Sequence, residues 1–300
     1  MSRRRAAALV AMAIGGVGLA ALGLTPGEVR DEPTPVASSA TRAFWTTYRE
    51  ATRRRSRGDL DGAVAAYQRA LALRPDHEDS LYYLGNCQLE RRAYAEAVDA
   101  YRRLVNLNPE GSPRAYVQWG LVHASLDAGA PRDLAEAERL FTRAVGLDPE
   151  SGAVLGLAEV ALLKGDVGRA QTWLERADVE NASSVAVPFL RGYLAWRRGA
   201  GGEAWTRFEA AVARGRTAKP PVSWSEEGDV KADPALRWQA LARQSVFGAH
   251  WLALRAYLEP PGPSPAVMSR EYRRLERVIA GARGPGPADQ DARRRRAAGG

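Results

Sequence analysis

Small and large apolar residues recur along the middle of the chain at intervals of about 34 residues. The small positions are alanines spaced by 34, 40, 33 and 34 residues: Ala63, Ala97, Ala137, Ala170 and Ala204. Four residues after each alanine stands a larger apolar residue: Tyr67, Tyr101, Phe141, Leu174 and Phe208. Because residues four apart lie on one face of an α-helix, this spacing predicts one amphipathic helix per repeat.

The signals of a turn and of another helix precede each of these helices. Glycines that suit a tight turn stand five residues before three of the alanines: Gly58, Gly165 and Gly199. Further upstream, a large residue is followed directly by a glycine at two places, Leu84-Gly85 and Trp119-Gly120. These pairs predict a first helix on which the glycine lets the second helix approach closely. A single helix pair cannot bury its apolar faces alone, so the pairs are expected to stack into a solenoid.

This pattern of helix pairs resembles the tetratricopeptide repeat family. Five repeats would begin near Phe44, Glu78, Pro113, Ser151 and Val185. The resemblance implies an all-α fold, a right-handed α-solenoid of about five helix pairs whose first helices line a concave groove. The third repeat departs from the pattern, because residues 127–131 lengthen the turn between its helices, and this leaves the repeat boundaries open.

The resemblance also implies which side chains line that groove. Carried onto this chain, the groove positions of the family are Trp45, Tyr48, Arg55, Tyr82, Asn86, Glu90, Arg114, Glu159, Phe189, Tyr193 and Trp196. Aromatic and arginine side chains are common binding anchors, although each aromatic can instead pack against a neighbouring repeat. The lysine clamp that holds a C-terminal carboxylate in some relatives is missing, which disfavours a receptor for C-terminal motifs.

Beyond residue 214 the pattern changes to a connector, residues 215–232, and then to two longer amphipathic segments. Asp233-Pro234 is typical of a helix start, and the apolar spacing predicts one long helix from there to about Leu258. Ser264-Pro265 starts another helix, with its apolar face formed by Met268, Tyr272, Leu275 and Ile279. We expect this pair, residues 233–282, to cap the solenoid, whose last repeat would otherwise expose apolar surface.

The N-terminal residues lie outside the repeat pattern and indicate export. Three arginines, residues 3–5, precede an uncharged run from Ala6 to Leu24, which is the pattern of a secretion signal. The run is also about long enough to span a bilayer. Residues 1–24 are therefore predicted to be a cleaved signal peptide or a retained N-terminal membrane anchor, with 25–41 as a flexible linker. Either alternative places the repeat domain, residues 42–214, in the periplasm or outside an anchoring cytoplasmic membrane.

The charge of the chain is concentrated at its ends. The formal net charge is +8, of which residues 3–5 carry +3 and the predicted disordered, arginine-rich tail, residues 283–300, carries another +3. The remaining +2 is too little for a phosphate-binding field, so no nucleic-acid partner is expected. One cysteine also excludes an intrachain disulfide framework.

Candidate chemistry is sparse. Three histidines, His77, His123 and His250, are far apart and outside any metal or nucleophile motif, and Cys87 has no cysteine partner. Glu226 and Asp229 form a small acidic group in the connector, for which a solvated loop is the simpler explanation. We therefore expect no catalytic residue, no metal, no cofactor and no small-molecule substrate.

Two classes of function follow from these expectations. The leading hypothesis is a non-catalytic scaffold outside the cytoplasm that binds a peptide or partner protein in the concave groove. The alternative is an accessory subunit of an envelope enzyme or assembly complex, in which the C-terminal helical pair completes a site containing His250, Glu226 and Asp229. A lipid or nucleic-acid binder acting through the arginine tail is a third, weaker possibility.

Overall fold

The computed structural model describes residues 35–180, 184–217, 222–224, 230–232, 242–243, 245–259 and 262–283. The chain divides into two compact units, Met1–Ser39 and Ala40–Gly300. The predicted export segment 1–24, most of the linker and nearly all of the arginine-rich tail lie outside the described residues. Among the helices that are described, none has the length and apolar character needed to cross a membrane.

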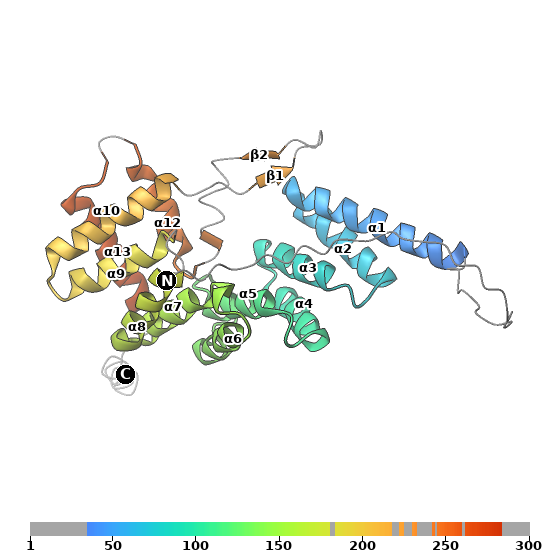
Figure 1. The fold of residues 1–300 in the computed structure, drawn as a ribbon, viewed down its shortest axis with the longest axis horizontal. Helices are drawn as coiled ribbons and strands as arrows, with labels where there is room; N and C mark the ends of the chain where they lie inside the picture. Colours follow the sequence, from blue (N-terminus) through green and yellow to red (C-terminus); the bar gives the residue numbers. More distant parts are fainter. Residues whose placement is uncertain are drawn as a thin grey trace, which may run out of the picture. The chain divides into compact units, whose positions relative to one another are not determined.

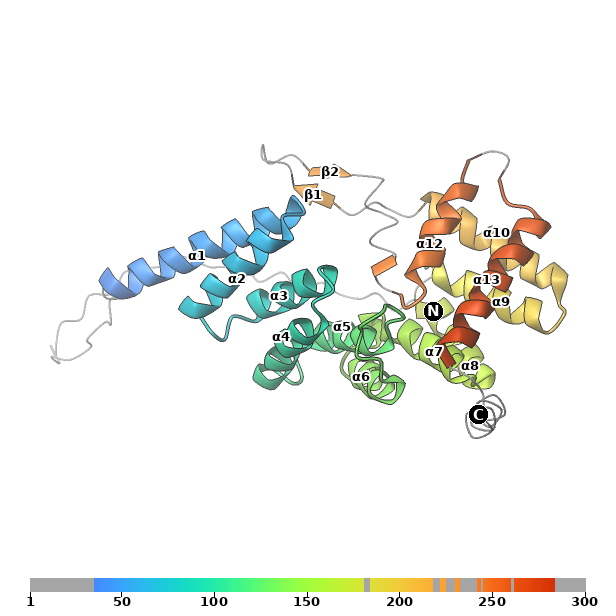
Figure 2. The ribbon, with the colours of Figure 1, turned by 180° about the vertical axis from the view of Figure 1, so that it is seen from behind.

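The predicted stack of helix pairs lies in the second unit, except for the first turn of α1, and Figures 1 and 2 show it from opposite sides. The first helix of each pair is α1 (Pro35–Ser56), α3 (Glu78–Glu90), α5 (Pro113–Ala124), α7 (Ala153–Lys164) or α9 (Ala186–Arg197). The second is α2 (Leu60–Leu73), α4 (Tyr94–Leu107), α6 (Leu134–Leu147), α8 (Val167–Glu180) or α10 (Gly201–Thr217). The predicted α-solenoid of about five helix pairs is thereby confirmed.

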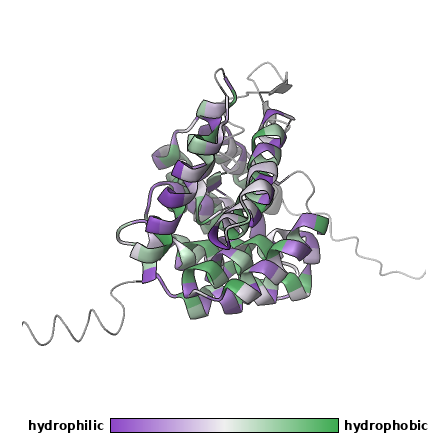
Figure 3. Ribbon diagram, turned by 90° about the vertical axis from the view of Figure 1, so that its left-hand side faces the viewer, coloured by the Kyte–Doolittle hydropathy of each residue, from purple (hydrophilic) through white to green (hydrophobic). Residues whose placement is uncertain are grey.

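The helices form this stack because their apolar residues share one face. Hydrophilic and hydrophobic residues alternate along the helices, as is typical of amphipathic helices (Figure 3). All five alanines of the repeat series and the large residue that follows each of them are completely buried. Gly58, Gly165 and Gly199 adopt φ values of 79°, 87° and 81°, which confirms the predicted tight turns between helices.

Close packing joins successive pairs through a large ring set against a glycine. Phe141 of α6 lies between α5 and α7, where a Cβ on Gly120 would come within 2.8 Å of its ring and one on Gly156 within 2.6 Å. Tyr101 of α4 packs in the same way on Gly85 of α3. Gly85 and Gly120 therefore set how closely α4 and α6 can approach α3 and α5, and Gly156 sets the approach of the next pair.

After α10 the chain forms a short hairpin that the sequence analysis did not predict. Strand β1 (Val222–Trp224) pairs antiparallel with β2 (Val230–Ala232), with Val222 opposite Ala232 and Trp224 opposite Val230. Both strands fall in the segment that we expected to be a plain connector. Three-residue strands are too short to produce a readable alternation of apolar and polar residues.

The predicted single helix from Pro234 to Leu258 is wrong. Residues 246–247 form a turn, which is followed by α12 (Gly248–Leu254) and the 3-10 helix η2 (Arg255–Tyr257). The turn is tight, because a Cβ on Gly248 would lie 2.2 Å from the carbonyl oxygen of Ala242. The polar groups of this turn form hydrogen bonds with a helix that is distant in sequence, as described below. The local spacing of apolar residues cannot indicate such a contact.

The last helix follows the prediction closely. Helix α13 (Pro265–Arg283) begins at the expected proline and buries Met268, Tyr272, Leu275 and Ile279. It contacts α7, α9 and α10, as a cap on the last repeats should. Arg283, which we had placed in the tail, is its last residue and donates hydrogen bonds to the carbonyl oxygens of Leu162 and Leu163, at 2.7 and 3.2 Å. These bonds satisfy carbonyl groups at the end of α7.

Candidate functional site

The first helices of the repeats present a common face, here called the first-helix face, which holds all the residues predicted to bind a partner. In repeats 1 to 3 these residues keep part of their surface. Trp45 is 39% exposed, and Tyr48, Arg55, Tyr82 and Asn86 are partly buried. Glu90 and Arg114 are exposed, but Glu90 forms an ion pair with Arg243, just before the turn at 245–247, at 3.0 Å. Apart from this contact at Glu90, the predicted residues of this half keep accessible surface, and we call it the open half.

In repeats 4 and 5 the same face is covered by the chain itself. Glu159 and Phe189 are completely buried, and Tyr193 is 1% exposed, so these three predicted groove residues are not available to a partner. The covering residues come from the turn at 245–247 and from α12 and α13, here called the C-terminal plug. The repeat register placed the three residues correctly on first helices, but it carried no information about this distant segment.

Glu159 shows how the C-terminal plug is held. The Ser245 hydroxyl donates to one carboxylate oxygen of Glu159, and the Val246 N–H donates to the other at 2.8 Å. Burial of the carboxyl group raises its pKa to about 7, an effect that the two hydrogen bonds reduce. The carboxyl group of Glu159 therefore stabilises the turn at 245–247 and is not accessible for binding a partner protein.

Aromatic rings complete the cover. Tyr272 of α13 is fully buried, with its ring centroid 5.1 Å from that of Phe189 and 6.1 Å from that of Tyr193. Trp196, the remaining predicted residue of repeat 5, is partly buried and lies 6.0 Å from the same ring. Rings at these separations add to the burial energy of the cap.

His250 belongs to the same plug and is 3% exposed. Its Nδ1 atom is buried and has no hydrogen-bond partner within the described part of the chain. Burial lowers the pKa of the imidazole to about 4, with the positive charge of Arg274 acting in the same direction. The histidine is therefore neutral at physiological pH.

A cavity of about 670 Å³ lies where the open half of the first-helix face meets the C-terminal plug. We call it the central cavity. Its lining includes Tyr82, Arg114 and Gln118 from α3 and α5, together with Val154 and Leu155 from α7. Further lining comes from η1 (Pro149–Ser151), the end of α8, the start of α9 and Ser245. The cavity brings together two of the predicted site residues, Tyr82 and Arg114.

The charges around the central cavity are unevenly satisfied. Arg114 is exposed and forms no ion pair with any described residue. Glu180, at the end of α8, is paired with Arg176 at 2.7 Å. Glu150 of η1 also lines the cavity, is exposed and forms no ion pair with a described residue, so the lining carries one uncompensated charge of each sign. Beside Val154 and Leu155, this combination suits an apolar side chain flanked by charged groups.

At the other end of the open half, Trp45 and Tyr48 belong to an aromatic cluster around His77. The ring centroid of His77 lies 4.7 Å from that of Phe44, 5.0 Å from Tyr48 and 5.8 Å from Trp45. The imidazole Nδ1 accepts from the Ser80 N–H at 3.1 Å, which caps α3. His77 therefore has a structural role, and Trp45 keeps the exposed surface of the cluster.

Two more predicted residues are held by contacts within the open half. The Arg55 guanidinium lies 4.3 Å from the ring centroid of Tyr83. The Asn86 side-chain oxygen accepts from the Tyr101 hydroxyl at 2.8 Å. This bond directs the asparagine with its amide nitrogen still without a partner among the described residues, so it can donate to a bound chain.

No arrangement typical of catalysis is present in the part of the chain that the structure describes. The three histidines lie on α3's cap, α5 and α12, and no group of three or more metal-ligating side chains gathers there. Cys87 is buried, and burial raises the pKa of its thiol to about 11, so the thiolate form is disfavoured. Glu226 and Asp229 of the alternative hypothesis lie outside the described residues.

Comparison with known families identifies the repeats. Residues 48–113 match one family model described as tetratricopeptide repeat, and residues 126–187 match a second model with the same description. The gap between the matches, residues 114–125, corresponds to α5 and the start of the lengthened turn.

Solved structures with similar folds agree with this assignment. PilW, described as a widely conserved type IV pilus biogenesis factor, is 17% identical with a TM-score of 0.52, over 78% of this chain and 98% of PilW. PilF of Pseudomonas aeruginosa is also 17% identical with a TM-score of 0.52, over 80% of this chain and 99% of PilF. A tetratricopeptide repeat protein from Parabacteroides merdae is 17% identical with a TM-score of 0.50, over 84% and 85% of the two chains. At these identities the likeness concerns the fold.

Proposed function

We propose, from the premise that this chain belongs to the tetratricopeptide repeat family, that it is a non-catalytic scaffold binding a partner protein on the open half of its first-helix face. Proteins built from these repeats are typically interaction scaffolds. The observation that carries the proposal is the division of that face. Its C-terminal half is filled by the C-terminal plug, whereas in repeats 1 to 3 aromatic, amide and charged side chains keep accessible surface, and two of them, Tyr82 and Arg114, line the central cavity.

The chemistry of the open half defines the kind of partner. The central cavity accepts an apolar side chain between Val154, Leu155 and Tyr82. Arg114 can pair with a carboxylate of the partner, and Glu150, which also lines the cavity, can pair with a basic group. Trp45 offers a second, rigid contact at the far end of the open half, and Asn86 can donate to the backbone of an extended chain. The partner segment is therefore one with an apolar side chain flanked by charged residues.

We further propose that the scaffold acts outside the cytoplasm. The support is the sequence of residues 1–24, with its arginines followed by an uncharged run. One of the similar structures is PilW, a type IV pilus biogenesis factor, and this likeness supports a role in envelope assembly. Sequencing the N-terminus of the mature protein tests this part, since a chain that begins near residue 25 is a cleaved export product and one that begins at the first residues retains the segment.

Binding on the open half is tested by crosslinking from one defined position. A photoreactive residue in place of Gln118, which lines the central cavity, should crosslink a partner in envelope fractions, and mass spectrometry identifies it. In the same protein, Tyr82→Ala and Arg114→Glu should each reduce the yield about tenfold, the effect expected of a binding hot spot. Val179→Ala, at an 86% exposed position on α8, is the matched control and should leave the yield unchanged.

The outcome against the proposal is equally specific. If the partners crosslinked from position 118 are captured equally by the wild type, Tyr82→Ala and Arg114→Glu proteins, the open half is not the binding surface. Circular dichroism of each variant should match that of the wild type, because Tyr82 and Arg114 are not part of the buried core.

A further inference from the structure

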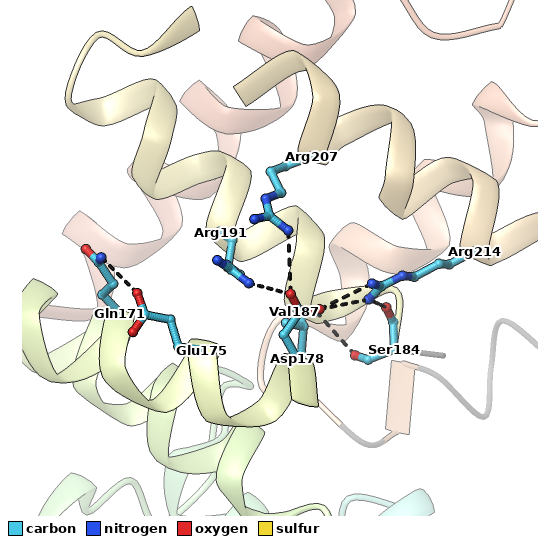
Figure 4. A network of polar contacts seen from close by, with 8 residues as sticks. All are labelled: Gln171, Glu175, Asp178, Ser184, Val187, Arg191, Arg207 and Arg214. Atoms are coloured by element: carbon cyan, nitrogen blue, oxygen red, sulfur yellow. Dashed lines mark hydrogen bonds and ion pairs between the residues drawn. The ribbon is translucent and has the colours of Figure 1, made fainter. Parts of the chain in front are cut away.

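Three arginines from two helices converge on one carboxylate at the junction of repeats 4 and 5. Asp178 of α8 accepts from Arg191 of α9 and from Arg207 and Arg214 of α10 (Figure 4). The Arg207 Nη1 atom is 3.5 Å from Oδ2, and the Arg214 Nη2 atom is 3.2 Å from Oδ1. We call these four residues the arginine cluster. None of them was singled out by the sequence, because arginines in a basic chain carry no distinguishing local pattern.

The arginine cluster has an excess of positive charge. Three guanidinium groups face one carboxylate, which leaves a formal surplus of two charges in one place. The side chains are only 18% to 30% exposed, so solvent screens their repulsion weakly. The next acids on α8 are engaged elsewhere, since Glu175 accepts from Gln171 and Glu180 from Arg176.

The arginine cluster also has more hydrogen-bond donors than acceptor sites. A carboxylate has about four acceptor sites, and the contacts from Arg191, Arg207 and both terminal nitrogens of Arg214 already use them. The Nε and second terminal nitrogen of Arg191 and Arg207 have no acceptor among the described residues. A single arginine would balance the charge of Asp178, so the other two add mutual repulsion and spare donors to the cluster.

We propose that the arginine cluster is a binding site for an oxyanion, the phosphate or carboxylate group of a ligand or partner. Such a group would neutralise the surplus charge and accept from the free N–H donors of Arg191 and Arg207. The site goes beyond the proposed partner surface, because its four residues do not line the central cavity. The two sites adjoin at Ser184, which lines the cavity and whose carbonyl oxygen accepts from Arg214 at 3.1 Å.

Thermal unfolding of the full chain in inorganic phosphate, compared with chloride at equal ionic strength, tests the site. Phosphate at about ten times its Kd should raise the melting temperature of the wild type by about 2–4 °C. Arg207→Gln should abolish this shift, since Arg207 makes the longest contact with Asp178 and its loss leaves the other two ion pairs. Arg103→Gln, which removes one exposed charge from α4, is the matched control and should keep the shift.

A second variant separates ligand binding from a structural role. Asp178→Asn removes the carboxylate that competes for the same donors, so its melting temperature in chloride should fall and its response to phosphate should exceed that of the wild type. Acetate distinguishes the two sources of the oxyanion, because a carboxylate site responds to it and a phosphate site does not. The proposal is overturned if the wild type melts at the same temperature in phosphate, acetate and chloride, or if Arg207→Gln retains the full shift.

Discussion

The carboxyl group of Glu159 is completely buried, and its folded-state pKa of about 7 lies above the ordinary value of 4.5. The folded protein therefore holds a proton on this group that the unfolded chain releases at lower pH. The corresponding stability is fully present below pH 4.5 and is lost as the pH rises to about 7. Over this window the free energy of unfolding should fall by about 3 kcal/mol.

His250 acts in the opposite sense. Its folded-state pKa of about 4 lies below the ordinary 6.5, so folding disfavours the protonated ring. Its contribution to stability is present above pH 6.5 and is lost as the pH falls towards 4. Since the windows of Glu159 and His250 overlap between about pH 4.5 and 6.5, their effects largely cancel there in the wild type.

Single substitutions should reveal the two hidden slopes. Glu159→Gln keeps an oxygen for the Val246 N–H and a donor for the Ser245 hydroxyl, but it cannot ionise. In urea unfolding its stability should rise between pH 4.5 and 6.5, whereas that of His250→Leu should fall across the same range. Parallel profiles for the two variants would contradict the assignment of these groups.

Glu159 also marks where prediction from sequence stops at the residue scale. Its place on a first helix followed from the repeat register, as did those of Tyr82 and Arg114, which do reach the central cavity. Its burial depends on Ser245, which lies 86 residues further along the chain. The apolar period around Ser245 indicates a continuous helix. The turn that is found there was missed because it is stabilised by a long-range contact rather than by the local sequence.

At the scale of elements, the ring of Phe141 shows why small residues recur on first helices. It occupies the space above Gly120 of α5 and Gly156 of α7, and any side chain there would overlap it. These contacts join neighbouring elements of one repeat series, so regular spacing along the sequence was enough to predict a close contact at Gly120, although it did not single out Gly156. This is the part of the fold that the sequence determined most completely.

Two glycine substitutions should therefore have opposite effects. Gly156→Ala improves helix propensity but places a Cβ 2.6 Å from the Phe141 ring, and overpacking of this kind costs about 1–3 kcal/mol. Gly146→Ala, in the helix that carries Phe141, meets no atom within 4 Å and should stabilise by up to about 1 kcal/mol. Thermal unfolding measures both, and equal melting temperatures for the two variants would refute the packing argument.

At the scale of the whole molecule, the C-terminal plug makes the last two repeats different from the first three. Helices α7 and α9 are buried almost all round, whereas α3 and α5 keep side chains at the surface. Each repeat of a solenoid contacts mainly its neighbours, so a cap stabilises the repeats that it touches most. The sequence predicted that a cap exists, but the residues that it covers depend on tertiary contacts.

Removing one ring should expose this division. Tyr272→Ala deletes a fully buried side chain that packs on Phe189 and Phe208, a change that costs about 3–5 kcal/mol in a core. Hydrogen exchange should then show faster amide exchange in α7, α9 and α10, with α3 and α4 unchanged, because α13 contacts the former group. Arg273→Ala, at the exposed neighbouring position, should leave every helix protected. Equal loss of protection in α3 and α9 would mean that the repeats unfold as one cooperative unit, and the open half of the first-helix face would then depend on the plug for its stability.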